Sequence, residues 1–142
     1  NAMRIHRSQP DYNFALAQSY TKMNKIKDAV IHFSHFIKAR PKNLKDWKEL
    51  INCLFDAGFY EEAIEQVDNA MKNTMDKPLL IFYSSAIFFA LGKPKEALLH
   101  LEIGMRKAPK LIKQFIEFNP SLLQNQQVVE IIAKYKKSKF SK

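Results

Sequence analysis

Few residues in this chain of 142 have the types and spacing that catalysis or metal binding requires. His32 and His35 are three residues apart, and on a helix this spacing can present two imidazoles to one metal ion. No cluster completes a ligand set around them, and the other two histidines, His6 and His100, are distant in the sequence. We therefore expect histidines that pack or face solvent, and no metal site.

The other candidates for chemistry are equally isolated. Cys53 lies beside Leu54 in an apolar stretch, which predicts a buried, unreactive thiol. With three glycines in the chain, no glycine-rich phosphate loop is present. Adjacent carboxylates on a helix surface are usually solvated, and the chain has one such cluster: Glu61, Glu62, Glu65 and Asp68. Because no nucleophile, base and oxyanion donor occur together, we expect a protein that is not an enzyme and has no cofactor.

Composition excludes several further classes of protein. A single cysteine cannot form an intramolecular disulfide, so a disulfide-built secreted scaffold is excluded. No apolar run approaches the roughly 20 residues that a membrane-spanning helix needs. The length fits one compact domain or a short repeat array. Residues 1–9 read as a tag remnant, Asn1-Ala2, followed by a polar lead-in without a signal peptide, which favours the cytoplasm.

An internal repeat organises most of the chain. Ala29, Ala63 and Ala97 occupy equivalent positions in three similar segments, and both intervals between them are 34 residues. The same interval relates three further sets, which are Tyr20, Leu54 and Phe88; Phe33, Val67 and Leu101; and Asn24, Gly58 and Gly92. A constant interval without insertions predicts three copies of one structural unit.

Each unit has the pattern of two helices joined by a turn. Trp47, Leu50, Ile51 and Leu54 recur at helical spacing, and the second half of the unit repeats this pattern from Ala63. Glycine or asparagine at the equivalent positions between the halves can adopt the left-handed conformation that ends a helix. The recurring alanine permits a close helix crossing, and Pro78 suits the first position of a helix. No segment alternates with period two, so we expect essentially no strand.

These residues resemble the signature of the tetratricopeptide (TPR) repeat, whose characteristic positions here are Trp47, Leu50, Leu54, Gly58, Tyr60, Ala63, Ile64 and Ala70. The resemblance implies an all-α, right-handed α-α superhelix (solenoid) with three helix hairpins over residues 10–111, in units 10–43, 44–77 and 78–111. Two departures fall in the first unit, where Asn13 replaces the tryptophan and Phe36 replaces a small residue at the second crossing. We expect a wider or repacked first hairpin there.

After Pro109 the repeat stops, and residues 112–142 read as C-terminal capping helices followed by a basic tail. A short helix is expected from Lys110 to Phe118, ended by Asn119-Pro120. We expect Ser121 to be the N-cap of a final helix that reaches about Lys136. The last unit of a solenoid exposes an apolar face, so this helix pair is interpreted as its cap.

The resemblance also implies a binding site, because in this family the first helices of successive units line a concave groove that holds a peptide or helix of a partner. The positions that would line the groove are Phe14, Gln18, Thr21, Lys22, Lys48, Asn52, Phe55, Phe82, Tyr83, Ala86 and Phe89. Exposed aromatic residues favour a hydrophobic ligand segment. In the alternative, the C-terminal helices cover these aromatic residues or the residues pack between helices.

Chaperone-binding members of the family clamp a carboxylate with lysine and asparagine side chains, and Lys48 with Asn52 matches one such pair. The remaining clamp positions correspond to Tyr83, Lys113 and Glu117. Tyr83 replaces an asparagine, and the Glu117 carboxylate would repel the ligand. The carboxylate clamp is therefore not favoured.

The net charge of +9 is unevenly distributed, because the middle unit carries −4 and the rest of the chain carries the positive excess. A basic surface can attract nucleic acid, although no recognised nucleic-acid motif is present. We predict a non-catalytic protein–protein interaction module. The alternatives are a basic accessory module that binds nucleic acid and a self-assembling structural element, which would form homo-oligomers.

Overall fold

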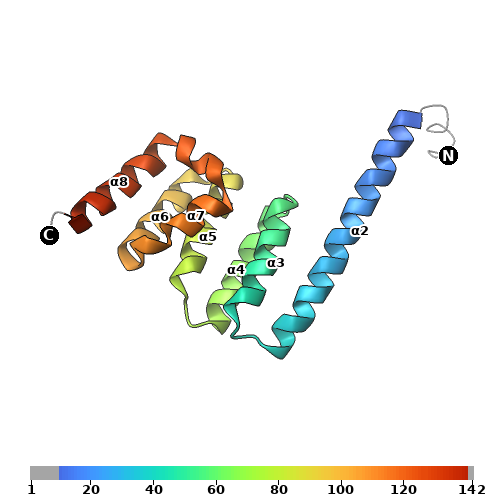
Figure 1. The fold of residues 1–142 in the computed structure, drawn as a ribbon, viewed down its shortest axis with the longest axis horizontal. Helices are drawn as coiled ribbons and strands as arrows, with labels where there is room; N and C mark the ends of the chain where they lie inside the picture. The colour runs from blue at the N-terminus through green and yellow to red at the C-terminus, as the bar shows by residue number, and fades with distance from the viewer. Residues whose placement is uncertain (1–9, 141–142) are drawn as a thin grey trace.

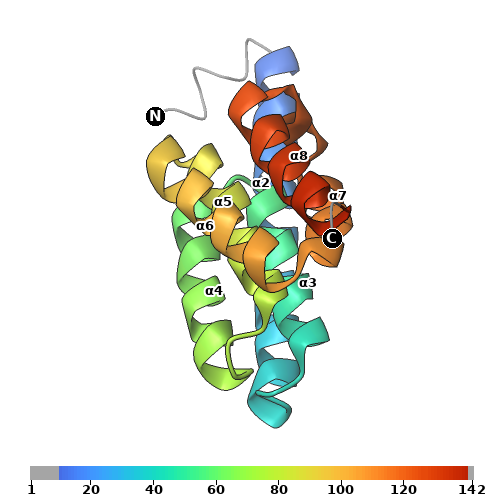
Figure 2. The same ribbon diagram turned by 90° about the vertical axis from the view of Figure 1, so that its left-hand side faces the viewer.

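The computed structural model describes residues 10–140, with side chains described from Met23 to Lys136. Every regular element among these residues is helical, and no strand occurs in this part of the chain. Figures 1 and 2 show the elements as an elongated array that begins with one long helix. In chain order they are α2 (Pro10–Ala39), α3 (Leu44–Asp56), α4 (Tyr60–Asn73), α5 (Pro78–Ala90), α6 (Pro94–Lys107), η1 (Pro109–Leu111), α7 (Ile112–Phe118), η2 (Pro120–Gln124) and α8 (Gln126–Phe140).

Two of the three expected hairpins are present. Helices α3 and α4 form one packed pair, and α5 and α6 form the next, with α4 against α5 between them. The first expected hairpin is absent, because residues 10–39 form one continuous helix of 30 residues with no break at Asn24. The prediction for this unit is therefore wrong, and the N-terminal half of α2 extends away from the hairpins (Figure 1).

The residue at the turn differs between the first unit and the other two. Gly58 and Gly92 have φ of +86° and +74°, which confirms the prediction that they adopt the left-handed conformation. The Gly58 N–H donates to the Phe55 carbonyl, and the Phe59 N–H donates to that of Leu54, at 3.0 and 2.9 Å. This paired capping motif ends a helix, and it recurs at Gly92. Asn24 has a Cβ that makes this conformation less favourable than it is for glycine without excluding it, and in α2 the helix continues through this residue.

The second crossing inside each hairpin also depends on a small residue. Ala70 and Gly104 are buried at equivalent positions of α4 and α6. A Cβ on Gly104 would lie 2.9 Å from the Phe82 Cζ, so the α5–α6 crossing is closer than any other residue would allow. Phe36 occupies this position in α2 and is 41% exposed, which shows that no close crossing forms in the first unit.

Helix α5 is the centre of the molecule. Nine consecutive residues, 79–87, are buried, so water is excluded from every side of the helix. Leu80 and Tyr83 belong to a core shared with α3 and α4, whereas Phe82 and Ala86 belong to a second core shared with α6, α7 and α8. Both cores therefore depend on the rotation of this one helix about its axis.

The C-terminal helices cover the last hairpin, with α7 against α5 and α8 against α6. The short helix ends at Phe118, as expected from Asn119-Pro120. The predicted N-cap of the final helix is wrong, since Ser121 lies within η2 and α8 begins at Gln126. Asn125 is the cap, and its Oδ1 accepts hydrogen bonds from the backbone N–H groups of Gln127 and Val128 at 2.9 and 3.3 Å.

The junction between α2 and α3 is held by polar contacts. The Arg40 Nη2 atom lies 3.1 Å from each carboxylate oxygen of Asp46, which is buried with 8% of its surface exposed. The Trp47 indole N–H donates to the Pro41 carbonyl at 2.7 Å. Asn43 caps α3 by accepting a hydrogen bond from the Asp46 N–H. These contacts fix the direction of α2 relative to the α3–α4 hairpin.

We predict that Gly104→Ala lowers the free energy of unfolding by about 1–3 kcal/mol, because the new methyl group overlaps the fully buried Phe82 ring. Urea denaturation of purified variants measures this. Phe82→Leu removes the obstructing atoms, so the Gly104→Ala substitution should cost much less in that background. Equal costs in both backgrounds would show that the Phe82 contact is not the cause.

Candidate functional site

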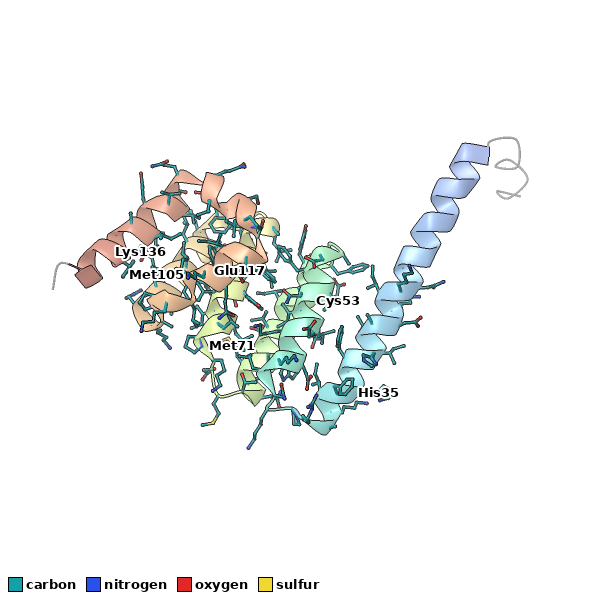
Figure 3. The ribbon with its side chains drawn as sticks, viewed as in Figure 1. His35, Cys53, Met71, Met105, Glu117 and Lys136 are labelled. Atoms are coloured by element: carbon teal, nitrogen blue, oxygen red, sulfur yellow. The ribbon has the colours of Figure 1, made fainter. Side chains whose placement is uncertain are left out.

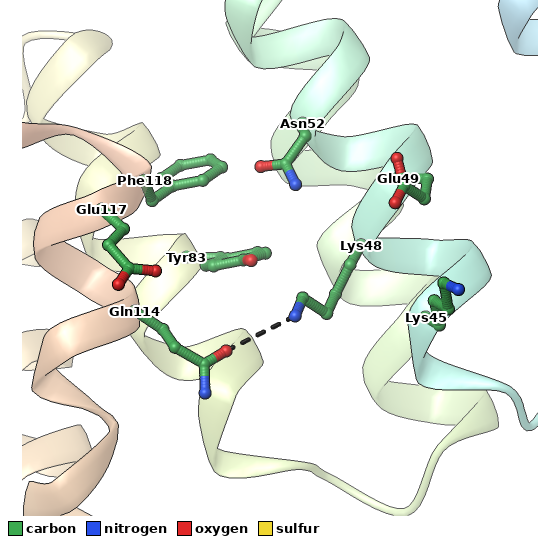
Figure 4. Close-up of a pocket in the computed structure, with 8 residues that line it drawn as sticks. All are labelled: Lys45, Lys48, Glu49, Asn52, Tyr83, Gln114, Glu117 and Phe118. Atoms are coloured by element: carbon green, nitrogen blue, oxygen red, sulfur yellow. Dashed lines mark hydrogen bonds between the residues drawn. The ribbon is translucent and has the colours of Figure 1, made fainter.

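A polar cavity of about 400 Å³ lies between α3, α5 and α7 (Figure 4). Helix α3 supplies one wall and α7 the opposite wall, with α5 between them. Eight residues line the cavity, which are Lys45, Lys48, Glu49, Asn52, Tyr83, Gln114, Glu117 and Phe118. Its volume lies at the lower end of the range for ligand pockets in proteins.

The walls carry charges of both signs and two amide side chains. Lys48 extends from α3 toward α7, where its Nζ donates to the Gln114 Oε1 at 3.4 Å (Figure 4). The lining includes two lysines, two glutamates, Asn52 and Gln114, so its formal charges balance. An amide side chain has both donors and acceptors, which suits it to bind another amide group.

Aromatic side chains form the apolar end of the cavity. The Phe118 ring lies 4.3 Å from the Tyr83 ring, stacked at an interplanar angle of 15°, and 4.4 Å from that of Phe55. Phe118 therefore joins three helices, since the three rings come from α7, α5 and α3. Such pairs contribute about 0.5–1.5 kcal/mol each beyond the apolar area that they bury.

Tyr83 is 4% exposed, and burial raises the pKa of its phenol. The Glu49 and Glu117 carboxylates raise this pKa further, while the neighbouring Asn52 amide lowers it. The phenol therefore stays protonated around neutral pH and can donate a hydrogen bond into the cavity.

The structure brings together three of the predicted groove residues, Lys48, Asn52 and Tyr83, all of which line the cavity. Phe55 and Phe89 are half-buried, and each packs against one of the two cores. Four predicted residues lie in α2, but their side chains fall outside the described part of the chain, namely Phe14, Gln18, Thr21 and Lys22.

Two predicted groove residues face the interior instead of a groove. Phe82 and Ala86 have no exposed surface, and the Phe82 ring packs 5.8 Å from that of Phe115 on α7. The alternative in which the C-terminal helices cover the aromatic residues therefore describes α5 correctly. The sequence offered a signal for this, because Phe115 and Phe118 share the apolar face of a short helix that needs a partner.

Sequence reasoning missed Lys45, Glu49, Gln114 and Phe118 as cavity residues. Lys45 and Glu49 lie one turn to either side of Lys48 on the same face of α3, so their positions follow from its assignment to the groove. Gln114 and Phe118 come from α7, whose placement against α5 has no repeat to predict it. Lys113, one of the clamp positions, is exposed and does not line the cavity.

The described residues hold no cluster of three or more side chains that could ligate a metal ion. The single cysteine, Cys53, lies on α3 (Figure 3) and is half-buried, which is less burial than predicted. Burial and the Asp56 carboxylate raise the pKa of its thiol, which opposes formation of a nucleophilic thiolate. None of the described helices combines the length and hydropathy needed to cross a membrane.

In a comparison with protein families, no family model matches this chain.

We predict that Phe118→Ala destabilises the protein by about 1–3 kcal/mol, less than for a fully buried phenylalanine because Phe118 is half-buried. Loss of its contacts with Tyr83 and Phe55 should also increase hydrogen exchange in α7. Leu123→Ala is the control, since Leu123 is 45% exposed in η2 and should change stability by less than about 0.5 kcal/mol. Equal stability of the two variants would contradict this role for Phe118.

We also predict that Cys53 reacts with a thiol-specific disulfide reagent more slowly at pH 8 than a free cysteine does. A raised pKa leaves less thiolate at a given pH, and partial burial restricts access. The rate should increase as the pH rises and also on unfolding in urea. Faster reaction in the folded protein than in the unfolded chain would indicate an activated nucleophile instead.

Proposed function

We propose that the chain is a non-catalytic protein–protein interaction module of the TPR type, which binds an extended segment of a partner in the cavity between α3, α5 and α7. The observation that carries this proposal is the convergence of Lys48, Asn52 and Tyr83 from two successive hairpins in one cavity. Support for the repeat type comes from two packed hairpins in a 34-residue register, each with a glycine of positive φ in its turn.

The lining of the cavity favours a peptide over a phosphate-rich ligand. The Asn52 and Gln114 amides offer the donors and acceptors that complement a peptide backbone, and Lys48 and Tyr83 add two donors. Glu49 and Glu117 in the same lining oppose the binding of polyanions. A nucleic-acid function would use a surface other than this cavity.

The ring of Phe118 limits the apolar surface that a partner segment can contact. It occupies the apolar end of the cavity by stacking on Tyr83, so a partner meets mainly polar groups and the edge of this aromatic stack. We therefore expect a short extended segment with polar side chains, with moderate affinity that depends on hydrogen bonds.

This function is tested by selecting peptides from a random display library against the full chain and measuring their affinities by calorimetry. Lys48→Ala with Asn52→Ala should weaken the selected peptides at least tenfold, which corresponds to about 1.4 kcal/mol. The matched control is Lys72→Ala with Asn73→Ala, an exposed pair at the end of α4 that does not line the cavity. The proposal fails if no peptide is enriched, or if both double variants bind alike.

A further inference from the structure

In both complete hairpins, the first helix covers one face of the second helix. Helix α2 carries the equivalent face. The positions on this face are Ala63, Val67 and Ala70 in α4, and Ala97, Leu101 and Gly104 in α6. All six are buried. Contacts confirm what covers them in α6, because the Ser85 hydroxyl of α5 donates to the Ala97 carbonyl at 2.6 Å and the Phe82 ring lies against Gly104.

The equivalent positions of α2 lack this cover. Ala29 is only partly buried, Phe33 is partly buried against the core shared with α3, and Phe36 is 41% exposed. In the register of the repeat, the helix that belongs on this face is residues 10–23, which aligns with α3 and with α5. Residues 10–23 and the uncovered face lie on one continuous helix, so a chain cannot supply the missing cover to itself.

We propose that a second copy of this chain supplies the missing cover, by exchange of residues 10–23 between two antiparallel α2 helices. The centre of α2, which spans Pro10–Ala39, lies between Asn24 and Lys25. A two-fold axis there places each N-terminal half on the C-terminal half of the partner helix. Both halves are therefore paired over their whole length, and the interface is closed and symmetric.

The sequence of residues 10–23 fits this role, because it retains the pattern of a first helix. Tyr20 aligns with Leu54 and Phe88, and Ala17 aligns with Ser85, the small residue that meets Ala97 in the third unit. Asn24 is the switch position, since glycine in the other units permits the turn that would close the hairpin within one chain. Exchange of an element through a straightened hinge is a low-cost route to a dimer.

This inference does not depend on the peptide-binding function, because the cavity lies between α3, α5 and α7. The partner of the uncovered face is a second copy and not a different protein, because the segment that fits by register is present in the same sequence. The exposed side chain of Ile31 lies outside the exchanged face, since the equivalent residues Glu65 and Leu99 are also exposed.

Light scattering coupled to size-exclusion chromatography, over a range of concentrations, tests the exchange in the full chain. The expected mass is twice the 16.6 kDa of one chain. Asn24→Gly with Ile26→Pro copies the Gly92 and Pro94 of the third unit and prevents a continuous helix, so it should yield a monomer with similar helix content. Asn24→Ala keeps the helix continuous and should remain dimeric.

A matched pair of charge substitutions locates the interface. Ala29→Glu places a carboxylate on the exchanged face and should weaken the dimer at least tenfold, whereas Ile31→Glu places the same charge beside that face and should leave the dimer intact. A monomeric wild-type chain at every concentration overturns the proposal. A dimer that persists in the Asn24→Gly, Ile26→Pro variant, or that responds to Ile31→Glu and not to Ala29→Glu, overturns it as well.

Discussion

The burial of α5 on every side is the constraint on which the rest of the molecule depends. Its Phe82 side chain fills the space that Gly104 leaves in α6 and also meets Phe115 of α7, so three helices are positioned by one ring. The next residue, Tyr83, is rotated by about 100° around the helix axis. Its side chain faces α3 and lines the cavity. Any rotation of α5 about its axis would therefore disturb the α5–α6 hairpin, the position of α7 and the cavity together, because close-packed interiors transmit displacement.

The parts of the fold that could be predicted from sequence are those with a local physical cause. Gly58 and Gly92 end helices because only glycine adopts a positive φ without strain, and a glycine with apolar residues on both sides can be identified directly. The backbone conformation of Asn24 could not be predicted in this way. Asparagine tolerates both the left-handed turn and the helix, so the outcome depends on tertiary contacts such as the crossing that Phe36 obstructs.

The candidate site likewise contains residues that could be predicted from the repeat and residues that could not. Lys48 and Asn52 could be placed because the repeat register assigns the face of α3 on which they lie. The apolar face of α7 indicated that it needs a partner, but the sequence could not show which aromatic residues it covers, since the same side chains suit an exposed groove and a buried interface. Phe115 packs against Phe82 and Phe118 against Tyr83, and α7 lies outside the repeat, so no register relates it to α5. What remains accessible is the polar part of the groove.

The two ends of the array meet the same physical requirement in different ways. A terminal hairpin exposes an apolar face, and ending there leaves that face in water unless another element covers it. At the C-terminal end, the chain supplies its own cover through Phe115 and Leu122, both buried against the last hairpin. At the N-terminal end, continuation of α2 through Asn24 moves the covering helix out of reach of its own face. The apolar positions recur in register in α2 but are not covered within the chain, and in the proposed dimer the association of two copies would remove them from water at both N-terminal ends at once.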